Sequence, residues 1–263
     1  MEDVQARTDS RGVPIDRVGI KRIKYPISVL DRERGKQYTI ASIDMFIELS
    51  PTFKGAHMSR FIEILNEHRE NFEMRKFTAI VHDIRKRLGA TSAHLELTFP
   101  YFIERKAPVS KSPSLMEYQG YICISSMGKE ETDIVVGVTV PVTTVCPCSK
   151  EISDAGAHNQ RTMMTIKVRM IDFIWIEELI DIAEQSASCE IYPLLKREDE
   201  KYVTEKAYSN PFFVEDVIRN AAVKLKKDKR VRWFHIEAEA MESVHNHNAY
   251  ASLEWNRDIN GTD

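Results

Sequence analysis

Two cysteines and a histidine lie close together in the sequence PVTTVCPCSKEISDAGAHNQR, which spans residues 141–161. Cys146 and Cys148 follow a run rich in valine and threonine, and His158 comes ten residues after the second cysteine. Side chains where a strand opens into a loop are held rigidly and can still reach a ligand. A thiolate, an imidazole and a carboxylate together make an open metal site with room for water, which is typical of catalytic centres. Two small buried thiols explain the cysteines equally well.

A second cluster begins at Glu242, in the sequence ESVHNHN. Residues two apart in an extended segment point to the same side, so we expect His245 and His247 to face one pocket. Two imidazoles beside a carboxylate can bind a metal ion or move protons near neutral pH. An exposed polar turn between two strands is the alternative interpretation.

Glu215 is a candidate for binding a purine base, and it lies in the sequence NPFFVEDVIR of residues 210–219. A carboxylate can accept two hydrogen bonds, one from a ring N–H and one from the neighbouring amino group. A carboxylate in the first turn of a helix is also favoured by the helix dipole, with no ligand involved. Glu200, in the charged sequence KREDEK, has the surroundings of a solvent-exposed position.

Composition limits the classes to which the chain can belong. It has 263 residues, with 37 Lys and Arg against 40 Asp and Glu, for a net charge of −3. This length suits one large domain or two small ones, and the charge balance favours neither a nucleic-acid nor a membrane partner. No segment is long and apolar enough to span a bilayer, and the start has no apolar signal-peptide core. We therefore expect a cytoplasmic protein whose four cysteines are free thiols or metal ligands.

The elements that position these residues follow from the spacing of apolar side chains. Alternation predicts eight strands, at residues 18–30, 37–49, 94–103, 118–126, 133–145, 161–171, 231–242 and 248–255. Helical spacing predicts helices at residues 58–65, 77–88, 174–183, 200–208 and 211–227. Pro211 suits the first position of the last helix, because proline lacks the N–H that would be unpaired there.

The order of elements occurs twice, as two strands, then helices, then two strands. The sequence GAHMSR at residues 55–60 matches GAHNQR at residues 156–161 in four of six positions. The repetition favours a duplicated α+β unit. We expect a flexible N-terminus at residues 1–14, a first unit at 15–130 and a second at 131–263, within one integrated domain. Most of the candidate site residues fall in the second unit.

The sequence from Pro141 to Arg161 closely resembles the signature of the prokaryotic type IB GTP cyclohydrolases. KGAHMSR at residues 54–60, NPFFVED at 210–216 and ESVHNH at 242–247 resemble the same family, in order along most of the chain. The resemblance implies a tunnelling fold, which is an α+β fold of two tandem ββααββ-type units with antiparallel sheets. In that family the chains form an oligomeric barrel, so the resemblance also implies a homotetramer with active sites at subunit interfaces.

The resemblance implies conversion of GTP and water to 7,8-dihydroneopterin triphosphate and formate, the first step of folate biosynthesis. It implies one divalent metal ion per site, namely zinc, manganese or iron. The enzymatic alternative is an archaeal-type relative that forms a cyclic-phosphate pterin. The alternative from another class is a nucleotide-binding tunnelling-fold protein without catalysis.

The resemblance also assigns roles to residues of this chain. The implied metal ligands are Cys146, His158 and Glu200. The implied catalytic residues are Cys148, His245, His247 and Glu242, of which Glu242 and His245 match positions that serve at the metal or in proton transfer. Glu215 matches the glutamate that anchors the guanine. A triphosphate requires cations, and the candidates are Lys54, His57 and Arg60.

Overall fold

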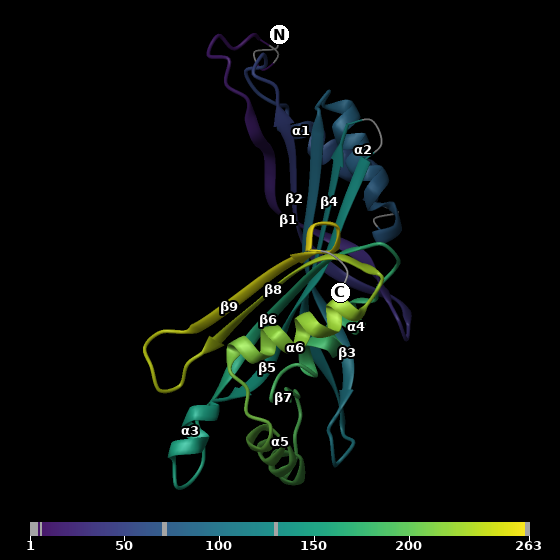
Figure 1. The fold of residues 1–263 in the computed structure, drawn as a ribbon. Helices are drawn as coiled ribbons and strands as arrows, with labels where there is room; N and C mark the ends of the chain where they lie inside the picture. The colour runs from purple at the N-terminus through teal and green to yellow at the C-terminus, as the bar shows by residue number, and fades with distance from the viewer. Residues whose placement is uncertain (1–4, 6, 70–72, 129–130, 261–263) are drawn as a thin grey trace. The chain divides into compact units, whose positions relative to one another are not determined.

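The computed structural model describes residue 5 and residues 7–69, 73–128 and 131–260 (Figure 1). The segment expected to be flexible, residues 1–14, falls partly on residues 1–4 and 6, which lie outside the described residues. Within that segment, Thr8 pairs with Phe53 in an isolated antiparallel bridge. The flexibility of the segment stays a prediction.

Strands contain more of the described residues than helices do, and they belong to one sheet. The strands are β1 (Ile15–Asp31), β2 (Gly35–Leu49), β3 (Ser92–Lys106), β4 (Pro113–Met127), β5 (Glu131–Val145), β6 (Asn159–Met170), β7 (Cys189–Glu190), β8 (Val231–Met241) and β9 (Ala249–Asn256). Neighbouring strands pair in the order β1–β2–β3–β4–β5–β6–β8–β9, and the short β7 pairs with β5. The pairings of β1 with β2, β2 with β3, β5 with β7, β6 with β8 and β8 with β9 are antiparallel.

The described residues also form short and medium-length helices. These are α1 (Met58–Glu67), the 3-10 helix η2 (Met74–Lys76), α2 (Phe77–Arg87), α3 (Pro147–Ile152), α4 (Ile176–Glu184), α5 (Arg197–Ser209), α6 (Val214–Lys227) and α7 (Arg257–Asn260). Within the described ranges, no helix has the length and hydropathy needed to cross a membrane. Every predicted strand and helix corresponds to one of the observed elements.

Contacts divide the chain into two compact units, residues 1–100 with 121–135, and residues 101–120 with 136–263. Strands β3, β4 and β5 therefore contribute residues to both units. The boundary of the expected duplication, between residues 130 and 131, stays a prediction.

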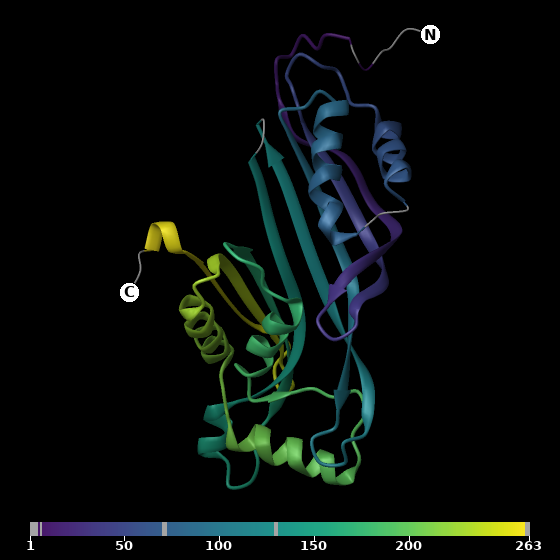
Figure 2. The same ribbon diagram turned by 90° about the vertical axis from the view of Figure 1, so that its right-hand side faces the viewer.

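The first unit begins with the predicted hairpin of β1 and β2. Asp31 Oδ1 accepts hydrogen bonds from the backbone N–H groups of Glu33 (2.9 Å) and Arg34 (2.7 Å), which closes the turn. Gly35 follows with a φ of +78°, a backbone conformation that glycine adopts without strain. Figure 2 shows α1 and α2 on one side of the strands of this unit. Their buried apolar side chains are Phe61, Ile64, Leu65, Phe77, Ile80, Val81 and Ile84.

In the second unit, α4 and α6 lie side by side against the strands of this unit (Figure 1). Residues of α6 are buried at helical spacing, from Val214 and Val217 to Leu225. Helix α6 begins at Val214, so the prediction that Pro211 opens this helix is wrong. The carboxylate of Asp216 accepts the backbone N–H of Phe213 at 3.1 Å and fixes the first turn there instead.

Two polar networks join residues 101–120 to the helices of the same unit. Arg105 lies 2.6 Å from a carboxylate oxygen of Glu184, whose other oxygen accepts the Tyr118 hydroxyl at 2.7 Å. The second network is centred on Asp199 in the first turn of α5. The Asp199 side chain is fully buried. Its Oδ1 accepts the backbone N–H groups of Val109 (2.8 Å) and Ser110 (2.9 Å).

The other oxygen of Asp199 accepts the Ser110 hydroxyl at 2.6 Å and the backbone N–H of Lys196 at 2.9 Å. Burial acts to raise the pKa of Asp199, but these hydrogen bonds outweigh it and hold the pKa well below its usual range. The ionised carboxylate therefore anchors α5 to the connection between β3 and β4.

We expect Asp199→Asn to lower the thermal unfolding temperature at neutral pH, because the amide would direct N–H groups at N–H donors. The folded pKa lies below the unfolded one, so the carboxylate stabilises the fold above about pH 4 and loses that effect as pH falls. The unfolding-temperature difference between wild type and variant should therefore shrink on acidification of metal-free protein. Glu198→Gln, an exposed position in the same helical turn, is the control. A difference independent of pH would contradict this account.

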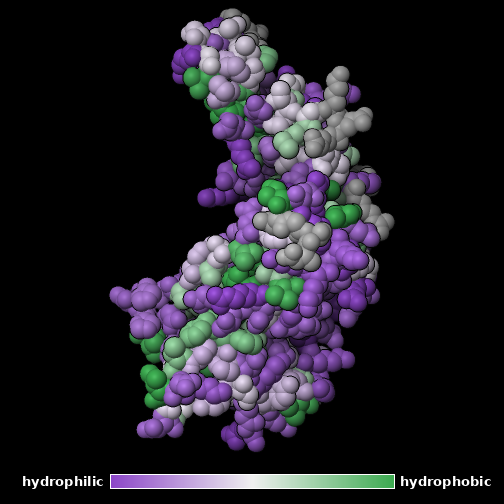
Figure 3. Space-filling model, viewed as in Figure 1, coloured by the Kyte–Doolittle hydropathy of each residue, from purple (hydrophilic) through white to green (hydrophobic). Residues whose placement is uncertain are grey.

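The face of the molecule seen in Figure 3 is mainly hydrophilic, with apolar residues scattered over it. Among the most exposed large apolar side chains are Tyr38 (82% exposed) and Ile40 (60%) on β2, and Tyr250 (59%) on β9. Single exposed apolar residues are ordinary on protein surfaces.

Candidate functional site

Cys146 lies where β5 ends and α3 begins. Its Sγ accepts a hydrogen bond from the backbone N–H of Ser149 at 3.4 Å, and Pro147 occupies the start of the helix. Cys148 lies in the first turn of α3 and is exposed, whereas Cys146 is partly buried. The sequence predicted a loop here, whereas residues 147–152 form a six-residue helix.

His158 is held beside the start of α3 by its backbone. The N–H of Cys146 donates to the carbonyl of His158 at 3.1 Å. The Ser149 hydroxyl donates to the Cys146 carbonyl (3.0 Å) and accepts the His158 N–H (3.2 Å). Gly156, with a φ of +82°, lets the chain return to this point. The two candidate ligands Cys146 and His158 are therefore neighbours through the backbone.

Glu242 comes from the other end of the chain to the same place. It follows β8, and the pairing of Arg161 with Met241 places it beside the start of β6. A carboxylate oxygen of Glu242 lies 3.8 Å from Nδ1 of His158, and the two side chains are only 12% and 21% exposed. Gln160, which was not among the candidates predicted from the sequence, contacts both side chains. Its only signal in the sequence was its position in the motif that ends at Arg161.

His245 and His247 lie in the exposed connection between β8 and β9. Their rings stack, with centroids 5.2 Å apart and planes at 18°. The two side chains therefore lie on the same side of the chain, as their spacing predicted. Both are exposed in a bend between two strands, which agrees with the alternative of an exposed polar turn, and neither lines the cavity described below. Their exposure allows exchange of protons with solvent, and their catalytic role stays a prediction.

The remaining candidates lie on helices. Glu200 is an exposed residue in the first turn of α5, and Glu215 is an exposed residue in the first turn of α6. Lys54, His57 and Arg60 belong to the first unit, where His57 precedes α1 and Arg60 lies in its first turn. The contacts within the second unit therefore cluster Cys146, His158 and Glu242, and leave the roles of the other candidates as predictions.

The donor set has the chemistry of a divalent-metal site, because a thiol, an imidazole and a carboxylate lie at neighbouring strand ends. Within the part of the chain that the structure describes, however, no group of three or more His, Cys, Asp or Glu side chains converges closely enough to hold a metal ion. The residue types fit a metal ion, whereas their positions in one chain do not form a closed ligand set.

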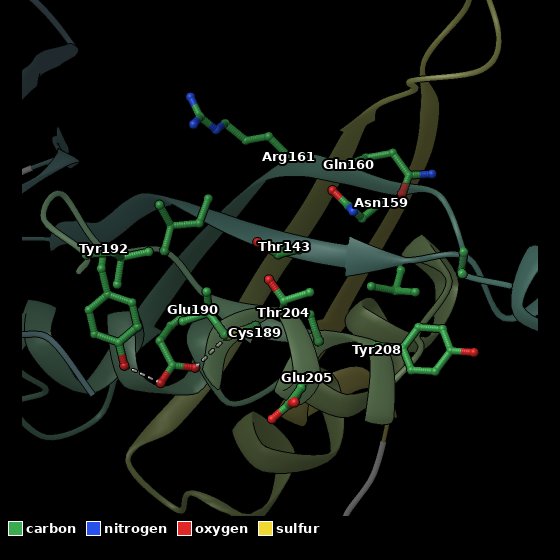
Figure 4. Close-up of a pocket in the computed structure, with 17 residues that line it drawn as sticks. Thr143, Asn159, Gln160, Arg161, Cys189, Glu190, Tyr192, Thr204, Glu205 and Tyr208 are labelled. Atoms are coloured by element: carbon green, nitrogen blue, oxygen red, sulfur yellow. Dashed lines mark hydrogen bonds between the residues drawn. The ribbon is translucent and has the colours of Figure 1, made fainter. Parts of the chain in front are cut away.

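A cavity of about 690 Å³ adjoins this cluster and lies between α5 and the ends of β5 and β6 (Figure 4). Gln160 and Asn159 line it from β6, and Thr204 and Tyr208 line it from α5. Its apolar lining comprises Val145, Ala157, Ile191, Leu195, Val203 and Ala207.

Glu190 is a charged group at the edge of this cavity. Its carboxylate accepts the Tyr192 hydroxyl at 2.6 Å (Figure 4). It also forms an ion pair with Lys206. Burial acts to raise the pKa of Glu190, but the hydrogen bonds from Lys206 and Tyr192 outweigh it and leave the pKa lowered. Burial, together with the neighbouring charge of Glu190, raises the pKa of the Cys189 thiol to about 12. Cys189 is therefore a neutral thiol at physiological pH.

We expect iodoacetamide to modify Cys148 in the folded protein long before Cys189. Only a thiolate reacts, and Cys189 is both 2% exposed and held protonated, whereas Cys148 is exposed. Mass spectrometry of tryptic peptides over a time course gives the two rates, and labelling in denaturant controls for intrinsic reactivity. Equal rates in the folded protein would contradict this environment for Cys189.

Solved structures resemble this chain in fold. The uricase from Arthrobacter globiformis matches with a TM-score of 0.54 at 8% identity, covering 94% of this chain and 96% of that chain. A uricase from Bacillus fastidious matches with a TM-score of 0.54 at 6% identity, covering 93% and 94%. Identities this low show the fold alone, which is the tunnelling fold that the sequence motifs implied.

Comparison with known sequences identifies the family as well as the fold. A family model described as type I GTP cyclohydrolase folE2 matches residues 1–251. A protein named GTP cyclohydrolase FolE2 from Syntrophus aciditrophicus is 56% identical over 256 residues, which cover 97% of this chain and 99% of that protein. The protein of the same name from Citrifermentans bemidjiense is 53% identical over 258 residues, covering 98% and 96%. The chain belongs to the type I GTP cyclohydrolase folE2 family, as the motifs around Cys146 and His158 indicated.

Proposed function

We propose that this chain is a metal-dependent GTP cyclohydrolase that converts GTP and water to 7,8-dihydroneopterin triphosphate and formate in folate biosynthesis. The observation that carries the proposal is the meeting of Cys146, His158 and Glu242 at neighbouring strand ends, in a chain of this family. A cytoplasmic location suits this reaction, because the nucleotide pool is cytoplasmic.

The reaction requires water to attack carbon 8 of guanine and the imidazole ring of the base to open. In this proposal Glu215 accepts hydrogen bonds from the N–H groups of the guanine. It thereby fixes the position of carbon 8 relative to the attacking water, which is a positioning effect. His245, His247 and Glu242 move protons to the ring nitrogen and the departing formyl group. The exposed Cys148 donates a proton, and Lys54, His57 and Arg60 bind the triphosphate.

The proposed metal ligands are Cys146, His158 and Glu200. A divalent cation held there would act as a Lewis acid and lower the pKa of the water that attacks carbon 8. Sulfur favours zinc, whereas carboxylate also suits manganese and iron, so the donor set is compatible with each of the three. A complete ligand set requires the side chain of Glu200 on α5 to reach the strand ends where Cys146 and His158 lie.

The proposed assembly is a homotetramer with active sites at subunit interfaces. Two features support an assembly through the sheet edges. The terminal strands β1 and β9 each have one edge without a partner strand among the described residues. Exposed apolar side chains such as Tyr38 and Tyr250 lie on or next to these strands.

The test is to strip the purified protein with a chelator, add back manganese, zinc or iron separately, and supply GTP. Formate and a pterin that becomes fluorescent after oxidation should both appear, and only with metal. A pterin whose mass corresponds to a cyclic phosphate would favour the archaeal-type reaction. Binding of GTP without either product would favour the non-catalytic nucleotide-binding protein.

A further inference from the structure

Asn210 connects the loop before α6 to a buried segment of the second unit. It follows α5 directly and comes five residues before Glu215, which lies in the first turn of α6. Its side-chain Nδ2 lies 3.3 Å from the backbone oxygen of Ala187 and 3.3 Å from that of Ser188. Carbonyl oxygens only accept hydrogen bonds, so the amide directs its NH₂ group at them, with one hydrogen for each carbonyl. One side chain therefore fastens the loop before α6 to two residues of another segment.

The segment that accepts these hydrogen bonds is itself fixed to the end of β5. Ala187 is 4% exposed and Ser188 is fully buried. The backbone N–H of Ser188 donates to the carbonyl of Thr143 at 3.0 Å, and the Ser188 hydroxyl accepts the N–H of Val145 at 3.1 Å. Cys146 follows Val145 directly. Two hydrogen-bonded steps therefore lead from the proposed ligand thiol to the loop before the proposed base anchor.

The middle of α6 is attached to the same segment by a different amide. Nδ2 of Asn220 donates to the backbone oxygen of Ser186 at 3.1 Å. The apolar face of the helix is buried as well. Apolar packing is non-directional, so it secures the helix as a body without fixing the exact place of an exposed side chain in its first turn. Asn210 therefore acts on the Glu215 end of the helix, and Asn220 acts on its middle.

We propose that Asn210 is a positioning residue, which fixes the distance between the guanine anchor Glu215 and the end of β5 where Cys146 lies. This role rests on the proposed function, since it takes Glu215 to hold the base and Cys146 to hold the metal ion of the same site. Carbon 8 and the attacking water are then placed by two separately built parts of the second unit. A displacement of about 1 Å between reacting groups can lower a rate by about 10²-fold, so the connection between the two parts matters for catalysis.

The test compares Asn210→Leu with Asn220→Leu. Both replace an amide by an apolar side chain of similar size, and both remove a donor from the same buried segment. Both variants should unfold at a lower temperature, because each leaves buried carbonyl oxygens without that donor. Only Asn210→Leu should lower kcat, by about 10²-fold. Its dissociation constants for manganese and, without metal, for GTP should stay close to those of wild type, because the proposed ligands and Glu215 are all still present.

A second measurement reports the geometry and does not depend on turnover. 7-Deaza-GTP keeps the N–H groups that Glu215 would bind and the hydrogen on carbon 8, but it lacks the ring nitrogen at which the imidazole ring opens. With manganese bound, the paramagnetic relaxation of that hydrogen depends steeply on its distance from the ion. Asn220→Leu should give the wild-type relaxation rate, whereas Asn210→Leu should give a different one. Asn210→Ser, whose donor is too short to reach both carbonyls, should behave like Asn210→Leu and serves if that variant does not fold.

An unchanged kcat and an unchanged relaxation rate in Asn210→Leu, with an unfolding temperature lowered as in Asn220→Leu, would leave Asn210 with a structural role and overturn the inference. Equal losses of kcat in the two variants would overturn it as well, because the effect would then come from loosening of the whole segment. Failure of the proposed function has a different signature, since wild type itself would then release neither formate nor pterin.

Discussion

Cys146→Ala should purify with little bound metal and should release almost no formate from GTP. Replacement of residues that only support ligands lowers metal affinity by about 10–100-fold, so removal of a thiolate ligand should lower it further. Metal analysis of the purified variant, followed by titration of the metal-free protein with manganese and zinc, gives the change in affinity. Activity should return only in part at high metal concentration, since the remaining donors are an imidazole and carboxylates.

Cys189→Ala is the matched control, because Cys189 is a buried thiol in the same unit. It lines the same cavity as residues of α5. Cys189→Ala should lose stability through the small void it leaves and keep its metal content. The ligand assignment for Cys146 is wrong if Cys146→Ala binds metal as tightly as Cys189→Ala does.

Glu215→Ala should bind GTP far more weakly while keeping its metal. Two charge-assisted hydrogen bonds to the guanine are worth about 1.5–3 kcal/mol each, so the dissociation constant should rise by about 10²–10⁴-fold. Calorimetric titration of metal-free protein with GTP measures the change without interference from turnover. ATP, which lacks the same pair of N–H donors, should bind weakly to both proteins.

Loss of a favourable helix-end charge could also weaken binding, by loosening the first turn of α6. Asp216→Ala separates the two effects, because Asp216 caps the same turn through the Phe213 N–H. It should destabilise the helix by about 1 kcal/mol and change GTP affinity much less than Glu215→Ala does. Equal losses of affinity in the two variants would mean that Glu215 serves the helix and not the base.

Most of the strands and longer helices were predictable because they show a clear apolar period, although the polar helix α5 does not. The strand predicted at residues 161–171 appears as β6, and the helix at residues 77–88 appears as α2. Helix α3 was missed because six residues that start with Pro147 give no period to read. The start of α6 was misplaced because Pro211 is a weaker determinant than the hydrogen bond from Phe213 to Asp216.

The candidate site was predictable in its members but not in its contacts. Cysteine, histidine and glutamate are candidates for metal binding or catalysis by residue type alone. Gln160 and Asp199 are not, since their importance comes from partners far along the chain. Gln160 contacts Glu242, 82 residues away, and Asp199 contacts Val109, 90 residues away. Only the pairing of strands and the docking of α5 bring such partners together.

The assignment of residues 101–120 to the second compact unit has a consequence for protein engineering. A gene divided between codons 130 and 131 would give a C-terminal fragment without Arg105, Tyr118, Val109 and Ser110. Asp199 would then be stripped of three of its four hydrogen-bond donors, and Glu184 of both its partners. A carboxylate deprived of its partners in an interior site is strongly destabilising. A split reporter or circular permutant therefore has to keep the β3–β4 tip with the C-terminal half.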